Sequence, residues 1–388
     1  MNDRQGREQG EEERDGAKRE CRDGDRHAPP RDQPCSPFRL HVATLGETPW
    51  RAKSSLWVAA CRRAARGLAM AMLAGEPSRH AAEAPASASA PVLQRARGRA
   101  EITVGIRHGR TRLADLHQSG CLKLRLPRAP GAVPEAVLIN TAGGLTGGDR
   151  LHVEATVRDG ARLALATQTA ERLYRSPRDH ALIDVSLRVG RGAALSWLPQ
   201  ETIAFEGSAL RRRLDVELAE DAGFLAVEPL VLGREAMGES LARAEIRDDW
   251  RVQVGGRLLH AEALRLGPEA RPWIERRAGW GGMRAGATVL LVGAAAPRAL
   301  EGARFLTGAG GAADLWPGGA LPPRLVVRLL GADGLAMRRV LLPLLAHLHG
   351  HLQGHLQGQL HGHLHAAAMG IDCPEAGQTA ALPRVWAL

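Results

Sequence analysis

Hydrophobic and polar residues alternate along most of the chain after residue 100, in short runs that end at glycine. In RLHVEATVRDGARLALATQTA, the apolar residues Leu151, Val153, Ala155 and Val157 alternate with polar ones, an Asp-Gly pair follows at 159–160, and a second apolar run comes next. A period of two predicts strands with one buried face, and a glycine-containing turn between two such runs predicts a hairpin.

The same pattern recurs in four further stretches: ALIDVSLRVGRGAALSWLP, ALRRRLDVELAEDAGFLAVEP, WRVQVGGRLLHAEALRL and RLVVRLLGADGLAMRRV. Serial hairpins with few helices between them predict a mainly β fold of antiparallel strands. Helical spacing of apolar residues occurs in only two places, a short segment at 170–175 and a longer one from Gly334 to about His349. Helices are therefore expected to be minor.

The ends of the chain differ in composition from this patterned part. Residues 1–95 are rich in charge and then in alanine, which predicts a disordered leader or a start codon assigned too far upstream. We expect the folded domain to span residues 96–348, followed by a low-complexity tract at 349–365 and a C-terminal tail at 366–388.

The low-complexity tract, HGHLQGHLQGQLHGHLH, is dense in histidine. A flexible chain of this kind can bind nickel, copper or zinc. Glycine at every fourth position costs about 1 kcal/mol each relative to alanine, which predicts that the tract without metal is not a stable helix. Replication slippage is an alternative origin, because His and Gln codons can differ in one base. The candidate metal ligands of this tail are His347, His349, His351, His355, His361, His363 and His365.

Charge and hydrophobicity narrow the function classes. The chain has 388 residues, 44% of them hydrophobic, which is enough for a large buried core, and a net charge of +10. Arginine supplies most of the positive charge and is spread over every segment, which argues against nucleic-acid binding and is compatible with an acidic protein partner. No apolar stretch reaches the roughly 20 residues of a membrane helix.

The most glycine-rich loop, NTAGGLTGGDRL, does not fit a phosphate-binding motif. A P-loop needs Lys after its last glycine, where this chain has Asp149. The paired glycines at 143–144 and 147–148 instead predict positive backbone angles or the close approach of another chain segment. No catalytic constellation is recognisable in the sequence. Carboxylates beside apolar strands, such as Glu228 and Glu262, require a cation, a proton or a metal.

Five blocks in a fixed order carry a resemblance to a known family: LHQSGCLKLRLPR, NTAGGLTGGDRL, ATQTAERLYRS, WLPQETIAFEGSALRRRLDVEL and EPLVLGREAMGE. They resemble the signature blocks of the urease accessory protein UreD (UreH) family over roughly residues 100–345. The final LPRVWAL is also similar to the family's C-terminal end. The resemblance implies a superhelical, mainly β body with a few short α-helices.

The resemblance also implies a function. Such proteins are cytoplasmic chaperones, not enzymes, that bind apo-urease (UreABC) together with UreF and UreG during nickel insertion. We therefore expect no tightly bound cofactor, transient passage of Ni²⁺, and neither nucleic acid nor membrane as a partner. Two alternatives stay open: a nucleotide-binding or hydrolytic enzyme that uses the loop at 143–149, and a histidine-rich metal-storage protein.

Three groups of residues follow from the resemblance. The glycine-rich signature loop comprises Asn140, Thr141, Gly143, Gly144, Gly147, Gly148 and Asp149. The candidates for lining a polar passage toward urease, as a metal relay, are Asp149, Glu228 and Glu262. The candidate partner or framework contacts are Thr167, Gln168, Arg172, Tyr174, Arg175, Ser176, Pro199, Gln200, Glu201, Phe205, Gly233, Arg234 and Glu239.

Overall fold

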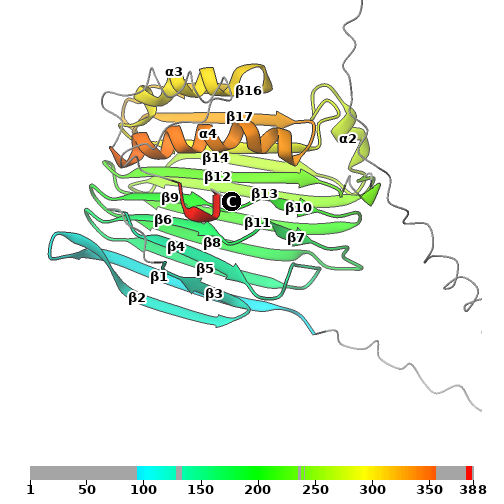
Figure 1. The fold of residues 1–388 in the computed structure, drawn as a ribbon, viewed down its shortest axis with the longest axis horizontal. Helices are drawn as coiled ribbons and strands as arrows, with labels where there is room; N and C mark the ends of the chain where they lie inside the picture. Colours follow the sequence, from blue (N-terminus) through cyan, green and yellow to red (C-terminus); the bar gives the residue numbers. More distant parts are fainter. Residues whose placement is uncertain (1–93, 128–132, 235–236, 240, 355–381, 387–388) are drawn as a thin grey trace, which may run out of the picture. The chain divides into compact units, whose positions relative to one another are not determined.

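The structure is a computed structural model that describes residues 94–127, 133–234, 237–239, 241–354 and 382–386. The predicted leader up to residue 93 and residues 355–381, which include His355, His361, His363 and His365, lie outside the described residues. The described chain forms two β-sheets and three α-helices (Figure 1).

The first sheet has the strand order β14-β13-β11-β8-β5-β1-β2. Its strands are β1 (Arg97–Arg107), β2 (Arg110–Gly120), β5 (Arg150–Val157), β8 (Ala181–Val189), β11 (Ser208–Leu218), β13 (Ala244–Val254) and β14 (Arg257–Leu266).

The second sheet has the order β16-β17-β15-β12-β9-β6-β4-β3, with the short β10 beside β12 and β7 beside β10. Its strands are β3 (Leu122–Arg125), β4 (Glu135–Asn140), β6 (Arg162–Thr167), β7 (Glu171–Leu173), β9 (Ala194–Leu198), β10 (Thr202–Ala204), β12 (Gly223–Leu232), β15 (Ala285–Val292), β16 (Gly311–Trp316) and β17 (Arg324–Gly331).

Between β4 and β13 the chain coils back and forth between the two sheets. β5, β8, β11 and β13 lie side by side and parallel in the first sheet, while β4, β6, β9 and β12 do the same in the second. This is a β-solenoid-like arrangement. It confirms the predicted mainly β, superhelical class.

The predicted antiparallel pairing is wrong for this central part. The runs on either side of the Asp-Gly pair at 159–160 form β5 and β6, which lie in different sheets and do not pair. The same holds for β8 with β9 and for β11 with β12. A glycine turn fits a passage between facing sheets as well as it fits a hairpin, so the local pattern does not distinguish the two.

Three further local predictions have mixed outcomes: one hairpin is confirmed, and another hairpin and a short helix are wrong. β13 and β14 form the predicted antiparallel hairpin. RLVVRLLGADGLAMRRV is not a hairpin, because β17 is followed by helix α4 (Gly334–Gln353). The segment predicted as a helix at 170–175 contains strand β7, which pairs with β10.

Helix α4 confirms the longer predicted helix and extends it. The Asp333 side chain caps its start by accepting a hydrogen bond from Ala336 N, and Gly354 ends it in the left-handed conformation. The prediction that the histidine tract does not form a helix is therefore wrong for its first residues, 349–353. Burial explains the difference, since Leu352 packs closely against Gly223 and outweighs the glycine cost at Gly350.

The described core has two layers. The larger cluster lies between the two sheets and includes Ile102, Val153 and Leu195. The second includes Leu225 and Leu341 and lies between the second sheet and helices α3 (Ala296–Thr307) and α4 (Figure 1). The short α2 (Arg271–Glu275) follows β14. Among the described helices, none has both the length and the apolar character to cross a membrane.

Candidate functional site

The glycine-rich loop leaves β4 and packs against the segment that contains β7. The Leu145 amide donates to the Arg172 carbonyl and the Tyr174 amide donates to the Leu145 carbonyl, both at 2.7 Å. At Gly144, where φ is +143°, a Cβ atom would lie 2.4 Å from the Tyr174 ring, and at Gly147 it would lie 2.2 Å from the Asp179 carbonyl oxygen. The predicted positive backbone angles occur at Gly143, Gly144 and Gly148. The segment that the loop approaches closely belongs to the same chain and runs from Arg172 to Asp179.

The polar groups of the loop bind each other and neighbouring backbone. Asp149 is buried, and its two carboxylate oxygens accept hydrogen bonds from the amides of Ala96 and Thr146, both at 2.8 Å. Thr141 donates its hydroxyl to the Cys121 carbonyl at 3.0 Å, and Gly148 donates its amide to a backbone carbonyl at 3.0 Å. Loop amides that are already bonded do not offer the free donors that cradle a phosphate.

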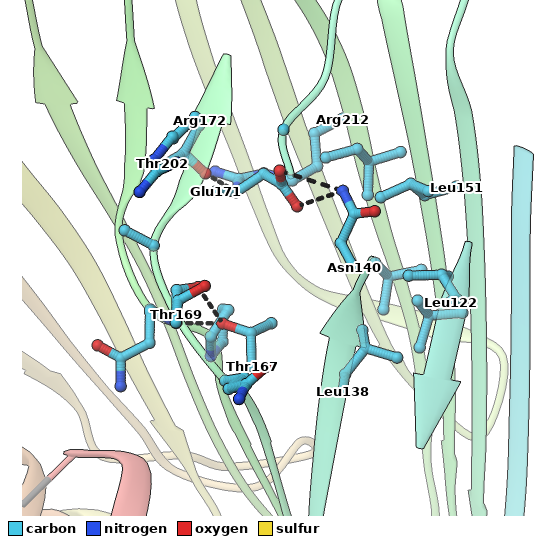
Figure 2. Close-up of a pocket in the computed structure, with 18 of the residues that line it drawn as sticks. Leu122, Leu138, Asn140, Leu151, Thr167, Thr169, Glu171, Arg172, Thr202 and Arg212 are labelled. Carbon is cyan, nitrogen blue, oxygen red and sulfur yellow. Dashed lines mark hydrogen bonds between the residues drawn. The ribbon is translucent and has the colours of Figure 1, made fainter. Parts of the chain in front are cut away.

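A cavity of about 180 Å³ lies between the two sheets next to this loop (Figure 2). Its walls are apolar side chains from both sheets, including Leu138 and Leu151. Its polar lining comes mainly from the ends of β4, β6 and β9 and from the segments that follow them. The polar and charged lining residues are Asn140, Thr167, Gln168, Thr169, Glu171, Arg172, Gln200, Thr202, Arg212 and Glu228.

Glu171 is a carboxylate of this cavity that the sequence analysis did not select. Figure 2 shows it facing Asn140, whose side-chain amide donates to its two oxygens at 3.2 and 3.1 Å. Burial raises the pKa of Glu171 to about 7, although the hydrogen bond from Asn140 opposes that shift. A carboxyl with such a pKa exchanges a proton near neutral pH.

Three buried charges form a cluster deeper between the sheets. Arg212 donates from Nε and Nη2 to the two oxygens of Asp248, at 3.0 and 2.6 Å, and its Nη1 forms an ion pair with Glu228. The Trp197 indole donates to the other oxygen of Glu228 at 2.9 Å. All three charged side chains are at most 7% exposed. One cation thus holds two carboxylates, so the cluster carries one excess negative charge.

The pKa of Glu228 reflects this imbalance. Burial raises the pKa of Glu228 to about 7, and repulsion from Asp248 adds to the shift, while attraction by Arg212 opposes it. The same two carboxylates raise the pKa of Arg212. Arg212 therefore stays charged, and Glu228 takes up or releases a proton near neutral pH.

A second cavity of about 250 Å³ lies on the other side of this cluster. Arg212 and Glu228 line both cavities, so their side chains form a shared wall. Glu262 lines the second cavity and forms an ion pair with Arg328. Nearby, burial lowers the pKa of His260 to about 4, and the positive charges of Arg324 and Arg328 add to the shift.

The structure thus brings together two of the three predicted relay carboxylates. Glu228 and Glu262 line one cavity, and Glu228 also faces the cavity beside the glycine-rich loop. Asp149 lines neither of these two cavities, and both oxygens of its carboxylate accept hydrogen bonds from backbone amides. Its described contacts stabilise the loop.

Four of the candidate contact residues form a surface group beside the loop. The Tyr174 and Phe205 rings meet edge to face at 5.2 Å, and the Arg234 guanidinium lies 4.2 Å from the Phe205 ring centre. Glu239 accepts a hydrogen bond from Arg234 at 3.0 Å, and this bond lowers the pKa of Glu239. Tyr174 is 41% exposed, so the group presents an aromatic ring to solvent.

Two other candidates tie α4 and the C-terminal segment to the second sheet. Arg338 of α4 donates to Gln200 and to Glu201, both at 2.8 Å, and lies 5.0 Å from the ring centre of Trp386. Trp386 donates its indole N–H to the Leu198 carbonyl at 2.8 Å. The described contacts of Gln200 and Glu201 are therefore internal.

The remaining candidates lie around the first cavity and its loops. The side chains or backbone of Thr167, Gln168, Arg172 and Pro199 line the cavity. The Arg175 carbonyl accepts a hydrogen bond from the Thr146 hydroxyl of the loop, and the Ser176 hydroxyl donates to the Asp179 carbonyl. The Gly233 amide donates to the Ala204 carbonyl.

The described histidines of the tail do not converge. His347 lies 3.0 Å from the Ala299 carbonyl, His349 lies 2.9 Å from the Ser196 hydroxyl, and the His351 ring meets the His347 ring edge to face. Burial lowers the pKa of both His347 and His351. Among the residues that the structure describes, no three metal-ligating side chains come together.

Comparisons with known proteins agree on one family. The family described as UreD urease accessory protein matches residues 96–360. The chain is 48% identical over 257 residues to urease accessory protein UreD 1 of Brucella melitensis, a match that covers 66% of this chain and 91% of the relative. It is 47% identical over 261 residues to urease accessory protein UreD of Chelativorans sp., covering 67% and 92%. The corresponding protein of Rhizobium leguminosarum is 46% identical over 256 residues, covering 66% and 92%.

Proposed function

The chain belongs to the UreD family of urease accessory proteins, and from this premise we propose that it is a non-catalytic scaffold that delivers nickel to apo-urease in the cytoplasm. It acts with UreF and UreG, and nickel is its transient cargo. The observation that carries the proposal is a pair of cavities between the sheets, lined by carboxylates and joined at the Arg212–Glu228 wall.

The residue chemistry suits transport better than storage. Oxygen ligands hold a divalent transition metal more loosely than imidazole or thiolate ligands do, so an ion bound to carboxylates can move on. In order along the two cavities, the proposed contacts are Glu171, Glu228 and Glu262. In the structure, Arg212 forms an ion pair with Glu228. A cation can therefore bind Glu228 only after Arg212 has released it and bound another partner.

The two alternative functions gain no support from the described residues. Several amides of the glycine-rich loop, those of Leu145, Thr146 and Gly148 among them, are bonded within the protein. The described histidines of α4 bind separate partners instead of sharing one site. We therefore carry forward the scaffold proposal alone.

Co-expression of apo-urease and its accessory proteins with and without this chain tests the scaffold role. Without the chain, we expect both the nickel content and the activity of purified urease to fall at least about tenfold. A tenfold ratio corresponds to about 1.4 kcal/mol. Unchanged nickel content would contradict the proposal.

The carboxylate route is tested separately by Glu171→Gln and Glu262→Gln. We expect each variant to assemble with its partners and to lower the nickel content of urease. Glu220→Gln is the matched control, because Glu220 is exposed and lines neither cavity. If the two cavity variants load urease as fully as the control does, the route is wrong while the scaffold role still stands.

A further inference from the structure

The fold gathers arginines that are far apart in the sequence into one row across the first sheet. The register aligns Arg97 of β1 with Arg150 of β5, and Arg150 with Leu182 of β8. It continues from Leu182 to Arg211 of β11. The last two members follow on β13 and β14. The arginine row is Arg97, Arg150, Arg211, Arg247 and Arg265.

All five side chains lie on the outer face of the sheet and are exposed. The alternate residues of these strands, such as Leu151, Leu210 and Ile246, are buried between the sheets. Helices α3 and α4 pack on strands of the second sheet, so neither of them covers this outer face. The row is therefore accessible across six neighbouring strands, a width of about 24 Å at about 4.8 Å per strand.

Most of the row is not neutralised by the protein itself. Arg247 pairs with Glu245 at 3.0 Å and Arg265 pairs with Asp249. Within the described residues, the side chains of Arg97, Arg150 and Arg211 form no ion pair or hydrogen bond. Like charges directly opposite each other destabilise a sheet. The row therefore opposes folding locally, and its described contacts do not compensate.

The next rows of the same face are different. Arg99 binds Glu101 and Glu154, and Arg213 lies 4.0 Å from Asp215. These charges alternate in sign and neutralise one another. The arginine row differs from these rows, because three of its members have no carboxylate partner among the described residues.

We propose that the arginine row is a docking surface for an acidic protein segment, namely a helix that carries one carboxylate per turn on a single face. The pitch of an α-helix, about 5.4 Å, is close to the strand spacing of about 4.8 Å, so carboxylates on successive turns come close to neighbouring strands. On β8 the row holds Leu182 in place of an arginine, so the contacts form on the strands on either side of it. Arginine suits this contact because its planar guanidinium binds carboxylates in a bidentate manner.

Charge favours such a segment over a nucleic acid. Glu101, Glu154 and Asp215 lie in one line four residues along the strands from the arginine row, a distance of about 13 Å, and Arg251 follows Asp215 in this line. A duplex is wider than one row of side chains and would bring its phosphates onto these carboxylates. A single helix fits on the row without reaching them.

The test uses the full chain and a fluorescent, alanine-based helical peptide with one glutamate per turn on one face. We expect binding, followed by anisotropy at low ionic strength, to weaken as salt is added. The triple variant Arg97→Gln, Arg150→Gln, Arg211→Gln should lower the affinity about tenfold, the combined effect of three exposed ion pairs. A peptide of the same composition with its glutamates spread around the helix should bind the wild type more weakly.

The matched control is Arg107→Gln, Arg110→Gln, Arg112→Gln, which removes the same charge from exposed positions around the β1–β2 turn. This control should change the affinity less than about twofold. Equal loss in both triple variants would mean that only net charge matters and would overturn the proposal. Tighter, row-dependent binding of a DNA duplex would overturn it in favour of nucleic acid. The proposal does not rest on the nickel route.

Discussion

Arg211 and Arg212 are consecutive residues of β11, but they lie in opposite environments. Arg212 points between the sheets, is 7% exposed, and binds Asp248, Glu228 and the Thr202 hydroxyl. Arg211 points outward, is exposed, and has Arg247 as its register partner on the next strand. The inner face thus supplies an excess of carboxylate around one arginine, whereas Arg211 on the outer face has no carboxylate partner among the described residues.

The difference shows that the same residue type has two unrelated roles on one strand. On the inner face, charge is desolvated, so each group depends on its partners for stability. On the outer face, water screens the charges, so the row costs little in the free protein and is available to an external partner. The same substitution should therefore change stability far more on the inner face than on the outer face.

The largest effect is expected from Arg212→Met. Removal of this side chain leaves Glu228 and Asp248 buried without a cation, and breaking a buried pair in this way costs about 3–5 kcal/mol of unfolding free energy. Arg211→Met is the matched control and should change stability by less than about 0.5 kcal/mol. Urea unfolding of both variants measures the contrast. Equal stability of the two variants would remove the distinction between the faces.

A smaller effect is expected from pH, through Glu228. Its pKa is about 7 in the folded protein, above the ordinary value of 4.5 expected in the unfolded chain. The folded protein therefore holds this proton more tightly, and stability is lost as the pH rises from about 4.5 to about 7. In Glu228→Gln, which keeps a side-chain oxygen for Trp197, this contribution is absent.

The measurement is the unfolding free energy of the wild type minus that of Glu228→Gln at pH 5 and pH 8. Subtraction cancels the contributions of Glu171 and His260, which both proteins share. We expect the difference to fall by about 1–3 kcal/mol over this range. A constant or rising difference would show that Arg212 holds Glu228 ionised at every pH in the range.

Much of the local structure follows from the sequence, because it depends on neighbouring residues. Alternation of apolar residues located most strands, helical spacing located α4, and the paired glycines predicted the positive backbone angles at Gly143, Gly144 and Gly148. Strand partners did not follow. β5 and β6 are adjacent in sequence and separated in space, because the turn between them leads from one sheet to the other.

Some of the charged residues could likewise be recognised from the local pattern, whereas others depend on which strands are neighbours. Arg212 and Asp248 occupy inward positions of β11 and β13, between Leu210 and Leu214 in the first case, so alternation alone could have identified them. Glu171 was missed because its place in the site depends on Asn140, which lies 31 residues earlier on another strand. The arginine row depends on the register of six strands, which no local pattern contains. Arginines that are scattered in the sequence therefore become one line in the fold.

The smallest predicted effect is a pair of changes in unfolding free energy that have opposite signs. Arg150 has Arg97 as its register partner on β1, whereas Arg213 lies between Asp184 and Asp249. Like charges opposite each other destabilise a sheet and opposite charges stabilise it, each by about 0.2–1 kcal/mol. Arg150→Gln should therefore raise the unfolding free energy by a few tenths of a kcal/mol, and Arg213→Gln should lower it by a similar amount. Chemical unfolding at low ionic strength, where these charges are least screened, measures both changes. A loss of stability in Arg150→Gln would mean that the arginine row supports the sheet itself, and the reason for assigning it to an external partner would disappear.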